Sequence, residues 1–373
     1  MQKKLIALAI AGLVSGGAFA QSTVTVSGLV RMSVEQYKLS NVTGRDSSTE
    51  NRISDQSSML VFKGREDLGG GMYAGFVFDN RWAPDMGSAQ SAGGNSNINI
   101  GGTWGEVAMG RQDLHYGTAI ESYKAYTLQN ILGNGIFAQV VGNAIANTTR
   151  TPNVIMYNSP NMSGFTGRLA LSSSFRGNEG SGVRLPGAND PGKGSATNVE
   201  LKYANGPIIA GYSYWRATTE GGKGATPGTG DQRGDTLQFA WTFPMGLKIG
   251  IAANQSKLEM TGGEAKRTAW LLPISYEFGA NQVAFTYAKA NNASGSFCGG
   301  GCNDTGANAY TLAYGRSLSK RTNLGVAYTK LDNKANATYD LFGLGANGAT
   351  SINTLGIGGV DAAQLSVNMN HAF

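Results

Sequence analysis

The sequence predicts an all-β protein, a closed antiparallel barrel of sixteen strands that spans a membrane. Three observations predict it. Segments in which apolar and polar residues alternate, each close to the length of a strand that crosses a bilayer, follow one another from residue 24 to residue 373. Long polar connections alternate with short turns. After the first twenty residues, no apolar run approaches the roughly 18 residues that a transmembrane helix needs.

Residues 1–20 have the pattern of a cleaved signal peptide, and residues 21–373 are expected to form the barrel as one domain. Lys3 and Lys4 precede an apolar stretch, and Ala18-Phe19-Ala20 places small residues at the two positions that a signal peptidase reads. Loss of Lys3 and Lys4 lowers the formal net charge from +6 to +4. Because the remaining basic residues are spread thinly along the chain, the sequence excludes nucleic acid as a partner.

The two cysteines, Cys298 and Cys302, are separated by three glycines, which would let so short a loop close. Cysteines of an exported protein usually pair, because the compartment is oxidising. A metal site is the alternative, but it would need two further ligands, and His115 and His371 lie in other segments. The sequence therefore predicts a disulfide between Cys298 and Cys302, with no metal and no cofactor.

The alternation is clearest in the first expected strand, where Val24, Val26 and Val30 share one face. Arg31 and Glu35 lie on the other face and would point toward water. Turn residues separate the strands in pairs, as in Ala204-Asn205-Gly206. Pro273 is an exception inside a strand, since it cannot donate a ladder hydrogen bond. The expected strands cover residues 24–35, 60–63, 74–79, 97–104, 106–112, 153–157, 165–171, 198–203, 208–214, 237–243, 247–253, 270–278, 283–287, 310–314, 324–328 and 365–373.

Two features of the connections and strand ends indicate a membrane barrel rather than a soluble sandwich. Long and short connections alternate strictly, as expected when short turns gather on one side of a membrane and long loops on the other. Aromatic residues favour strand ends, which predicts a girdle at each membrane interface. These aromatic residues are Tyr37, Trp82, Trp104, Tyr203, Trp215, Trp270 and Phe278.

Several short motifs occur together and in order. They are Phe62-Lys63-Gly64 with Glu66-Asp67-Leu68-Gly69, Gly110-Arg111-Gln112, Arg150 with Tyr157-Asn158-Ser159-Pro160, and the terminal Phe373 preceded by His371. On these residues the chain resembles the general porins of Gram-negative outer membranes, over essentially the whole mature length. The resemblance implies a multi-pass barrel in the outer membrane that assembles as a homotrimer. It also implies contact with outer-membrane lipid and lipopolysaccharide, with the barrel-assembly machinery, and with small hydrophilic solutes and ions.

The last strand and the third loop carry further expectations. Phe373 ends an alternating strand and resembles the signal that the assembly machinery reads; the alternative is a terminal residue of no consequence.

The resemblance implies that the third loop, residues 113–149, folds into the lumen as a constriction. Its tyrosines and aliphatic residues, such as Tyr123 and Ile131, are too apolar for a free outer loop. A surface loop with a small core of its own, or a loop in the trimer contact, are the alternatives.

A porin of this kind needs a hole and a transverse electric field at its narrowest point, not a reacting group. The resemblance implies acids on the loop and a ladder of arginines on the facing wall. Met59 and the asparagines of residues 95–99 depart from that ladder. With a mature charge of +4 and few loop acids, a weak anion preference is expected. The candidate constriction residues are Asp113, Glu121 and Lys124 of the loop, Arg150 by its motif, and Arg31, Lys63, Arg65, Asp79 and Arg81 by inward parity.

The function expected from these patterns is a water-filled channel for passive diffusion of small hydrophilic solutes. Gly343 to Gly348 matches a dinucleotide fingerprint by letters but lies in a glycine-rich loop, outside the strand and helix that would give it meaning. No persuasive nucleophile lies beside His115 in the sequence, so an enzyme is not expected. A substrate-selective channel of the same fold and an adhesive or structural surface barrel are the alternatives.

Overall fold

The computed structural model describes residues 23–41, 47–115, 150–175, 194–219, 223, 230–298, 302–341 and 357–373. The expected signal peptide of residues 1–20 lies outside these ranges. Within them, the chain is a single antiparallel sheet and one short 3₁₀ turn, η2 (Ser296–Cys298). No helix in the described part of the chain is long and apolar enough to cross a membrane.

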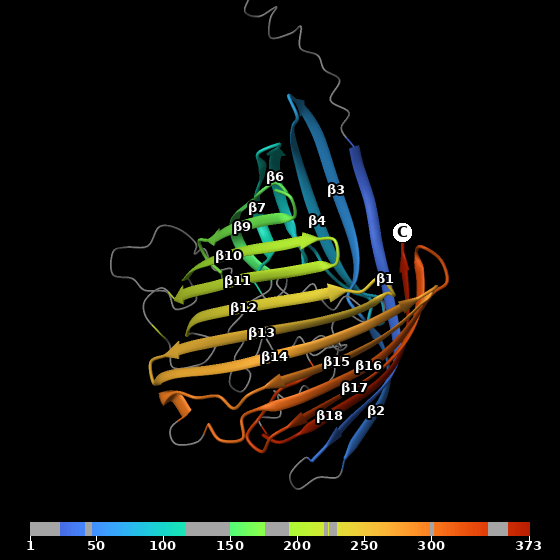
Figure 1. Cartoon of the computed structure of the whole chain (residues 1–373), viewed down its shortest axis with the longest axis vertical. Helices are drawn as coiled ribbons and strands as arrows, with labels where there is room; N and C mark the ends of the chain where they lie inside the picture. The colour runs from blue at the N-terminus through green and yellow to red at the C-terminus, as the bar shows by residue number, and fades with distance from the viewer. Residues whose placement is uncertain are drawn as a thin grey trace, which may run out of the picture.

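The sheet closes into a barrel (Figure 1). Apart from β2 with β3 and β5 with β6, each strand pairs with the next along the chain, and β1 also pairs with β18, so that the first and last strands form the seam. The strands are β1 (Thr23–Ser40), β2 (Ser48–Asp55), β3 (Ser58–Gly69), β4 (Met72–Ala83), β5 (Ser88–Gln90), β6 (Ser96–Gly102), β7 (Gly105–Asp113), β8 (Arg150–Asn158), β9 (Phe165–Ser172), β10 (Gly194–Asn205), β11 (Ile208–Thr219), β12 (Asp231–Thr242), β13 (Leu247–Met260), β14 (Gly263–Phe278), β15 (Asn281–Ala290), β16 (Ala307–Ser317), β17 (Thr322–Asn333) and β18 (Asp361–Ala372).

The sheet contains eighteen strand segments, whereas the sequence predicts sixteen strands. The difference arises because two of the wall strands are each broken into two segments. β2 and β3 both pair with β1 and are separated only by Gln56 and Ser57, where Ser57 has a positive φ of 69°. β5 and β6 likewise both pair with β4. Counting each broken strand once gives sixteen, so the predicted barrel is confirmed.

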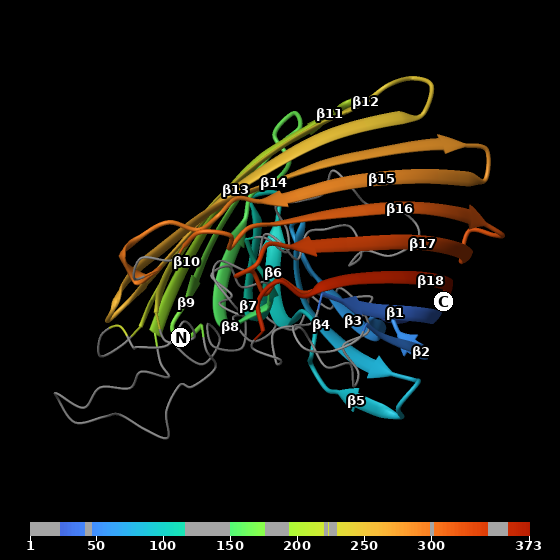
Figure 2. The same cartoon turned by 90° about the horizontal axis from the view of Figure 1, so that it is seen from below.

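Short turns and long connections gather at opposite ends of the barrel. In Figure 2 the turns that follow β12, β14 and β16 lie together at one end. The predicted strict alternation was wrong at one place, because β13 and β14 are joined at the long-loop end by Thr261 and Gly262 alone. The sequence predicted a loop there, whereas both strands continue to this tight turn. Short turns mark the periplasmic side of such barrels, so the long connections are extracellular.

The inner and outer faces of the wall differ as the alternation predicts. On β1, Val24 and Val34 point outward and are 67% and 62% exposed, whereas Glu35 points inward and is 2% exposed. Along β15 to β18 every inward position is uncharged and holds Ala, Gly, Leu, Ser, Thr, Asn or Gln. An apolar outer face and a polar inner face are what a bilayer outside and water inside require.

The aromatic girdles are only partly as predicted. Tyr37 and Trp215 lie near strand ends but have inward parity and are buried, at 6% and 0% exposure, so neither belongs to a girdle. Trp82, Trp104 and Phe278 are exposed on the outer face, where the prediction placed them. Proximity to a turn in the sequence therefore did not identify the girdle; parity along the strand decides which face a ring occupies.

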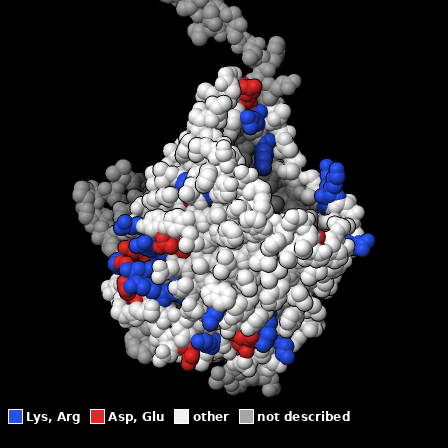
Figure 3. Space-filling model, viewed as in Figure 1, with Lys and Arg blue, Asp and Glu red and all other residues white. Residues whose placement is uncertain are grey.

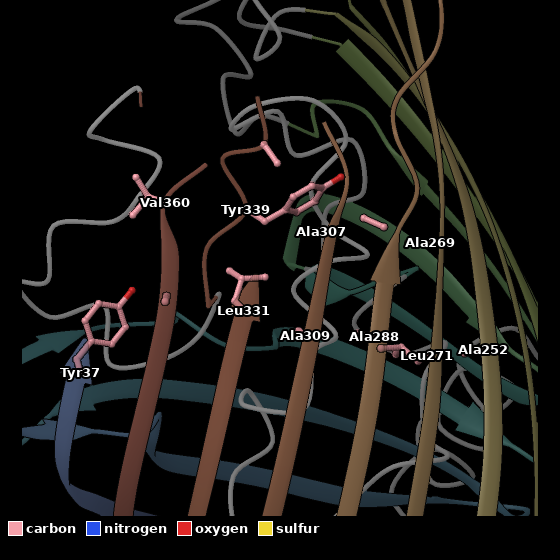
Figure 4. Packing of buried hydrophobic residues seen from close by; sticks show 13 residues of the cluster. Tyr37, Ala252, Ala269, Leu271, Ala288, Ala307, Ala309, Leu331, Tyr339 and Val360 are labelled. Atoms are coloured by element: carbon pink, nitrogen blue, oxygen red, sulfur yellow. The ribbon is translucent and has the colours of Figure 1, made fainter. Parts of the chain in front are cut away.

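The inner wall near the extracellular end is covered by part of the connection between β17 and β18. Tyr339 of that connection packs among inward alanines of β14 to β16, with Leu331 and Val360 beside it (Figure 4). Asn333 holds the segment by donating its side-chain amide to the carbonyls of Tyr339 and Val360, at 2.8 and 2.7 Å. This mouth of the barrel is therefore narrower than the strands alone would leave it.

Proline and glycine each mark a special place in the wall. The ladder between β13 and β14 runs from the pair Ile249–Ile274 directly to Ala252–Leu271, so Pro273 interrupts it as expected.

At the seam between the first and last strands, Gly28 and Phe373 exchange two backbone hydrogen bonds, at 3.0 and 3.1 Å. A Cβ on Gly28 would stand 2.3 Å from the Phe373 ring, so only glycine fits beneath the terminal aromatic residue.

Candidate pore constriction

Charged side chains gather on the inner face of β1 to β4. Arg31 on β1 interacts electrostatically with Asp55, which attracts it, and with Arg81, which repels it. Glu35, two inward positions further along β1, pairs directly with Arg52 of β2. Asp79 and Arg81 follow each other on the inward positions of β4, opposite Val61 and Met59 of β3. The broken strand β2–β3 and its neighbours thus carry cations and anions side by side.

Two of these arginines are neutralised by carboxylates. Arg52 Nε lies 3.0 Å from Glu35 Oε2, and Arg81 Nη2 lies 2.6 Å from Asp79 Oδ2. Glu35 also accepts hydrogen bonds from the Ser33 hydroxyl, at 2.6 Å, and from the Gln56 amide. The acid of the first pair is therefore held by three donors and fixed in place, since charge-assisted hydrogen bonds are the strong ones.

The guanidinium groups keep N–H donors that have no acceptor among the described residues. Arg31 Nε, both terminal nitrogens of Arg52 and Arg81 Nε have no hydrogen-bond partner among the described residues. Unsatisfied N–H groups of this kind cost free energy unless something accepts from them. These nitrogen atoms are buried, so the arginines act on the lumen through their charge and not through free donors.

Two further cations of this wall have no carboxylate partner in the described part of the chain. Lys63 and Arg65 occupy inward positions of β3, opposite Thr25 and Thr23 of β1. Arg65 lies over the ring of Tyr73, with its Cζ 3.7 Å from the ring centroid, a cation–π contact that leaves the charge in place. Together with Arg31 they form a row of positive charge that runs along β1 and β3 toward the periplasmic turns.

On the opposite wall, formed by β9 to β11, lie an ion pair and the first residues of the third loop. Arg168 on β9 lies 3.1 Å from Glu200 on β10. Past the end of β7 the chain turns inward, and fully buried His115 donates its backbone N–H to Glu200 Oε1 at 3.1 Å. The His115 ring contacts the Ser213 hydroxyl at 2.9 Å. Residues 114–115 therefore lie against the inner face of β10 and β11.

The remaining predicted site residues are placed as follows. Asp113 and Arg150 pair across the ends of β7 and β8, with 3.5 Å between Arg150 Nε and Asp113 Oδ1, at the base of the third loop. Glu121 and Lys124 lie outside the described residues, so the acid of the loop stays a prediction. Cys302 is disulfide-bonded, while the side chain of its expected partner, Cys298, is not among those described.

Sequence reasoning did not include Arg52, Arg168 and Glu200 among the constriction residues. Arg52 lies on β2, whose outward residues Thr49 and Asn51 are polar, so no alternation marked the strand. Arg168 and Glu200 do have inward parity in strands that were predicted. The signal that would have found them is their cross-strand pairing, which requires the register between β9 and β10.

A closed barrel with an apolar outer face and a charged inner wall defines a channel-forming protein of the outer membrane. The family model described as Gram-negative porin matches residues 7–336. The chain therefore belongs to the Gram-negative porin family.

Individual relatives agree with this assignment. The chain is 29% identical to outer membrane porin protein 32 of Delftia acidovorans over 383 aligned positions, which span 100% of both chains. The solved structure of an anion-selective porin from Comamonas acidovorans matches with a TM-score of 0.74 and 26% identity, covering 95% of this chain and 100% of that one. The trimer form of OmpT from Vibrio cholerae shares the fold, with a TM-score of 0.65, 12% identity and coverage of 94% and 99%.

Proposed function

We propose that this porin is a passive diffusion channel for small hydrophilic solutes with a mild preference for anions. The observation that carries the proposal is the row formed by Arg31, Lys63 and Arg65, because the latter two have no carboxylate partner in the described part of the chain. The uncharged inner face of β15 to β18 offers no acids to offset it. The related porin from Comamonas acidovorans is anion-selective, which supports the same preference.

The physical basis is the field between walls of unequal charge. Fixed charges in a narrow, water-filled passage raise the local concentration of ions of opposite sign and orient polar solutes. A channel of this kind lowers no reaction barrier and needs only an open path. Glu121 and Lys124 on the third loop, with the Asp113–Arg150 pair at its base, are proposed to complete the constriction.

The same relatives support a proposal for assembly and location. We infer a homotrimer, as OmpT forms, embedded in outer-membrane lipid and lipopolysaccharide, with Phe373 recognised by the barrel-assembly machinery. The backbone pairing of Phe373 with Gly28 supports a role for this residue in closing the barrel.

Planar-bilayer recording of the purified protein tests the channel and its preference together. In a KCl gradient the reversal potential should take the sign of the chloride equilibrium potential, and conductance should close in three equal steps. Absence of conductance would instead favour an adhesive or structural barrel. Conductance that saturates with one class of solute would favour a substrate-selective channel.

A further inference from the structure

A buried histidine of the inner wall contacts polar groups on two strands of the barrel. His115 follows the end of β7 and is fully buried. Its Nδ1 lies 2.9 Å from the Ser213 hydroxyl oxygen of β11, and its Nε2 lies 3.5 Å from the Thr236 hydroxyl oxygen of β12. The ring of Trp215 stacks on the imidazole, with 6.3 Å between the two centroids. The imidazole is therefore fixed in one orientation, with a hydroxyl group at each nitrogen.

The Ser213 hydroxyl connects the imidazole to a carboxylate. Ser213 Oγ lies 3.5 Å from Glu200 Oε1 on β10, and the same carboxylate oxygen accepts the backbone N–H of His115 at 3.1 Å. Asn198 donates its side-chain amide to Ser213 Oγ at 3.0 Å. The hydroxyl hydrogen of Ser213 therefore has two acceptors within reach, which are Nδ1 of a neutral imidazole and the Glu200 carboxylate.

A proton added to Nδ1 breaks none of these contacts. In the neutral imidazole with its hydrogen on Nε2, Ser213 donates to Nδ1. After protonation, Nδ1–H donates to Ser213 Oγ and the hydroxyl hydrogen turns to Glu200 Oε1, while Nε2–H stays directed at Thr236. The only movement is the rotation of one hydroxyl group. Burial opposes a charge on the ring, whereas the nearby carboxylate and the complete set of hydrogen bonds favour it.

The charged groups around His115 come from strands on both sides of it. β11, β12 and β13 place uncharged hydroxyl and amide groups next to the ring. β7 to β10 and β14 provide the charged groups, which are Asp113, Arg150, Arg168, Glu200 and Arg267. Asp113 lies 3.5 Å from Arg150, and Arg168 lies 3.1 Å from Glu200, so each of these two pairs is neutral. A proton on His115 therefore adds one positive charge to this part of the wall.

The imidazole lies at a level where its charge acts on ions in the pore. Ser213 and Thr236 lie near the middle of β11 and β12, so the imidazole is far from both mouths of the barrel. On the outside of the barrel, charged atoms gather toward the strand ends, and the central surface is uncharged in the view of Figure 3. Fixed charges of the inner wall set the local concentration of ions in a narrow, water-filled passage.

We propose that His115 is a selectivity-determining residue whose proton adds a positive charge to the inner wall and increases the anion preference of the channel as the pH falls. An imidazole in water gains its proton at about pH 6.5, within the range of natural waters and tissues. Arginine and lysine keep their charge throughout that range, so they supply the constant part of the preference. The proposal rests on the proposed anion-preferring channel and makes its selectivity depend on acidity.

Reversal potentials of the full-length protein in a KCl gradient test the proposal when they are measured at about pH 7.5 and about pH 5.5, on either side of the histidine range. The wild-type permeability ratio of chloride to potassium should rise about twofold at the lower pH, because a unit charge near a permeating ion changes its local concentration by that order. His115→Gln keeps a hydrogen-bonding side chain but cannot take up a proton, so its ratio should be the same at both pH values.

The second histidine of the chain provides a matched control. His371 is exposed on the outer face at the periplasmic end of β18 and is the only other histidine in the sequence. His371→Gln should therefore keep the wild-type rise in the permeability ratio. Equal ratios of the wild-type protein at both pH values, or the same rise in His115→Gln, would overturn the proposal.

A direct titration of the ring makes the test independent of ion current and of the folding of any His115 variant. Isotope labelling of histidine gives two imidazole signals in magnetic resonance spectra, and the one that remains in His371→Gln belongs to His115. This signal should change from the neutral to the charged form between about pH 7.5 and about pH 5.5. Glu200→Gln should move the change to lower pH, because it removes the carboxylate that favours the charged ring.

The two measurements separate this proposal from the proposed function. A His115 ring that stays neutral down to about pH 5.5 would overturn the proposal even if the channel prefers anions. A channel without any anion preference would contradict the proposed function, and the ring titration would still decide whether His115 carries a charge.

Discussion

Replacement of Arg31, Lys63 and Arg65 by glutamine is expected to abolish the anion preference of the channel. These cations line the inner face of β1 and β3, and two of them have no carboxylate beside them in the described part of the chain. A unit charge about 6 Å from a permeating ion in water contributes roughly 0.7 kcal/mol, or about threefold in local ion concentration for each residue. Reversal potentials in a KCl gradient measure the change, which should bring the permeability ratio to unity or below.

Two further variants test this prediction, one that should leave the anion preference unchanged and one that should increase it. Arg316→Gln removes the same charge from the outer face and should leave the reversal potential unchanged. Glu35→Gln releases Arg52 from its ion pair and should strengthen the preference for anions. If the triple variant kept the wild-type potential, the selectivity would have to come from residues outside this wall.

Substitution of Gly28 by valine is expected to prevent most of the protein from reaching the folded barrel. The first atom of the new side chain would stand 2.3 Å from the Phe373 ring and 2.8 Å from the Met59 carbonyl oxygen, and the carbonyl cannot move aside as a flexible side chain could. The fraction of protein that keeps the heat-modifiable, folded mobility in electrophoresis measures the effect. Gly167→Val is the matched control, because the nearest atoms to a Cβ there lie 3.9 Å away.

A second variant separates closure of the barrel from recognition by the assembly machinery. Phe373→Ala keeps the backbone bonds to Gly28 but removes the ring. If Phe373 acts as the proposed signal, this variant should fold into lipid vesicles in vitro yet fail to reach the outer membrane in cells. Equal loss in both settings would assign the ring a purely structural role at the seam.

The membrane-spanning part of each strand could be predicted from the sequence, and the part beyond the membrane could not. Leu237 and Phe239 alternate with polar residues because one face meets hydrocarbon, so period two is visible there. Further along the hairpin of β13 and β14, Gln255 and Lys257 point outward into water, and both faces are polar. The alternation vanishes although the ladder continues, so residues 254–269 were expected to be a loop. The same loss of contrast hid β2 and with it Arg52.

The candidate site was predictable in its residue types and less so in its pairs. Parity placed Arg31, Lys63, Arg65, Asp79 and Arg81 on the inner face, where they are found. Parity cannot say which carboxylate neutralises which arginine, because the pairing of Glu35 with Arg52 depends on the register between β1 and β2. The unpartnered cations, on which the proposed selectivity rests, are known only after those pairs are assigned.

The seam between Gly28 and Phe373 also constrains the order of events during biogenesis. The last strand, β18, is synthesised after all the others, and Phe373 beside it pairs with Gly28 of the first strand. Until then β1 has an open edge whose N–H and C=O groups are unpaired, and such edges invite aggregation. A truncated chain could not close its ring at all. Pairing of the first strand with the last thus ensures that only chains that carry both strands become sealed, edge-free barrels.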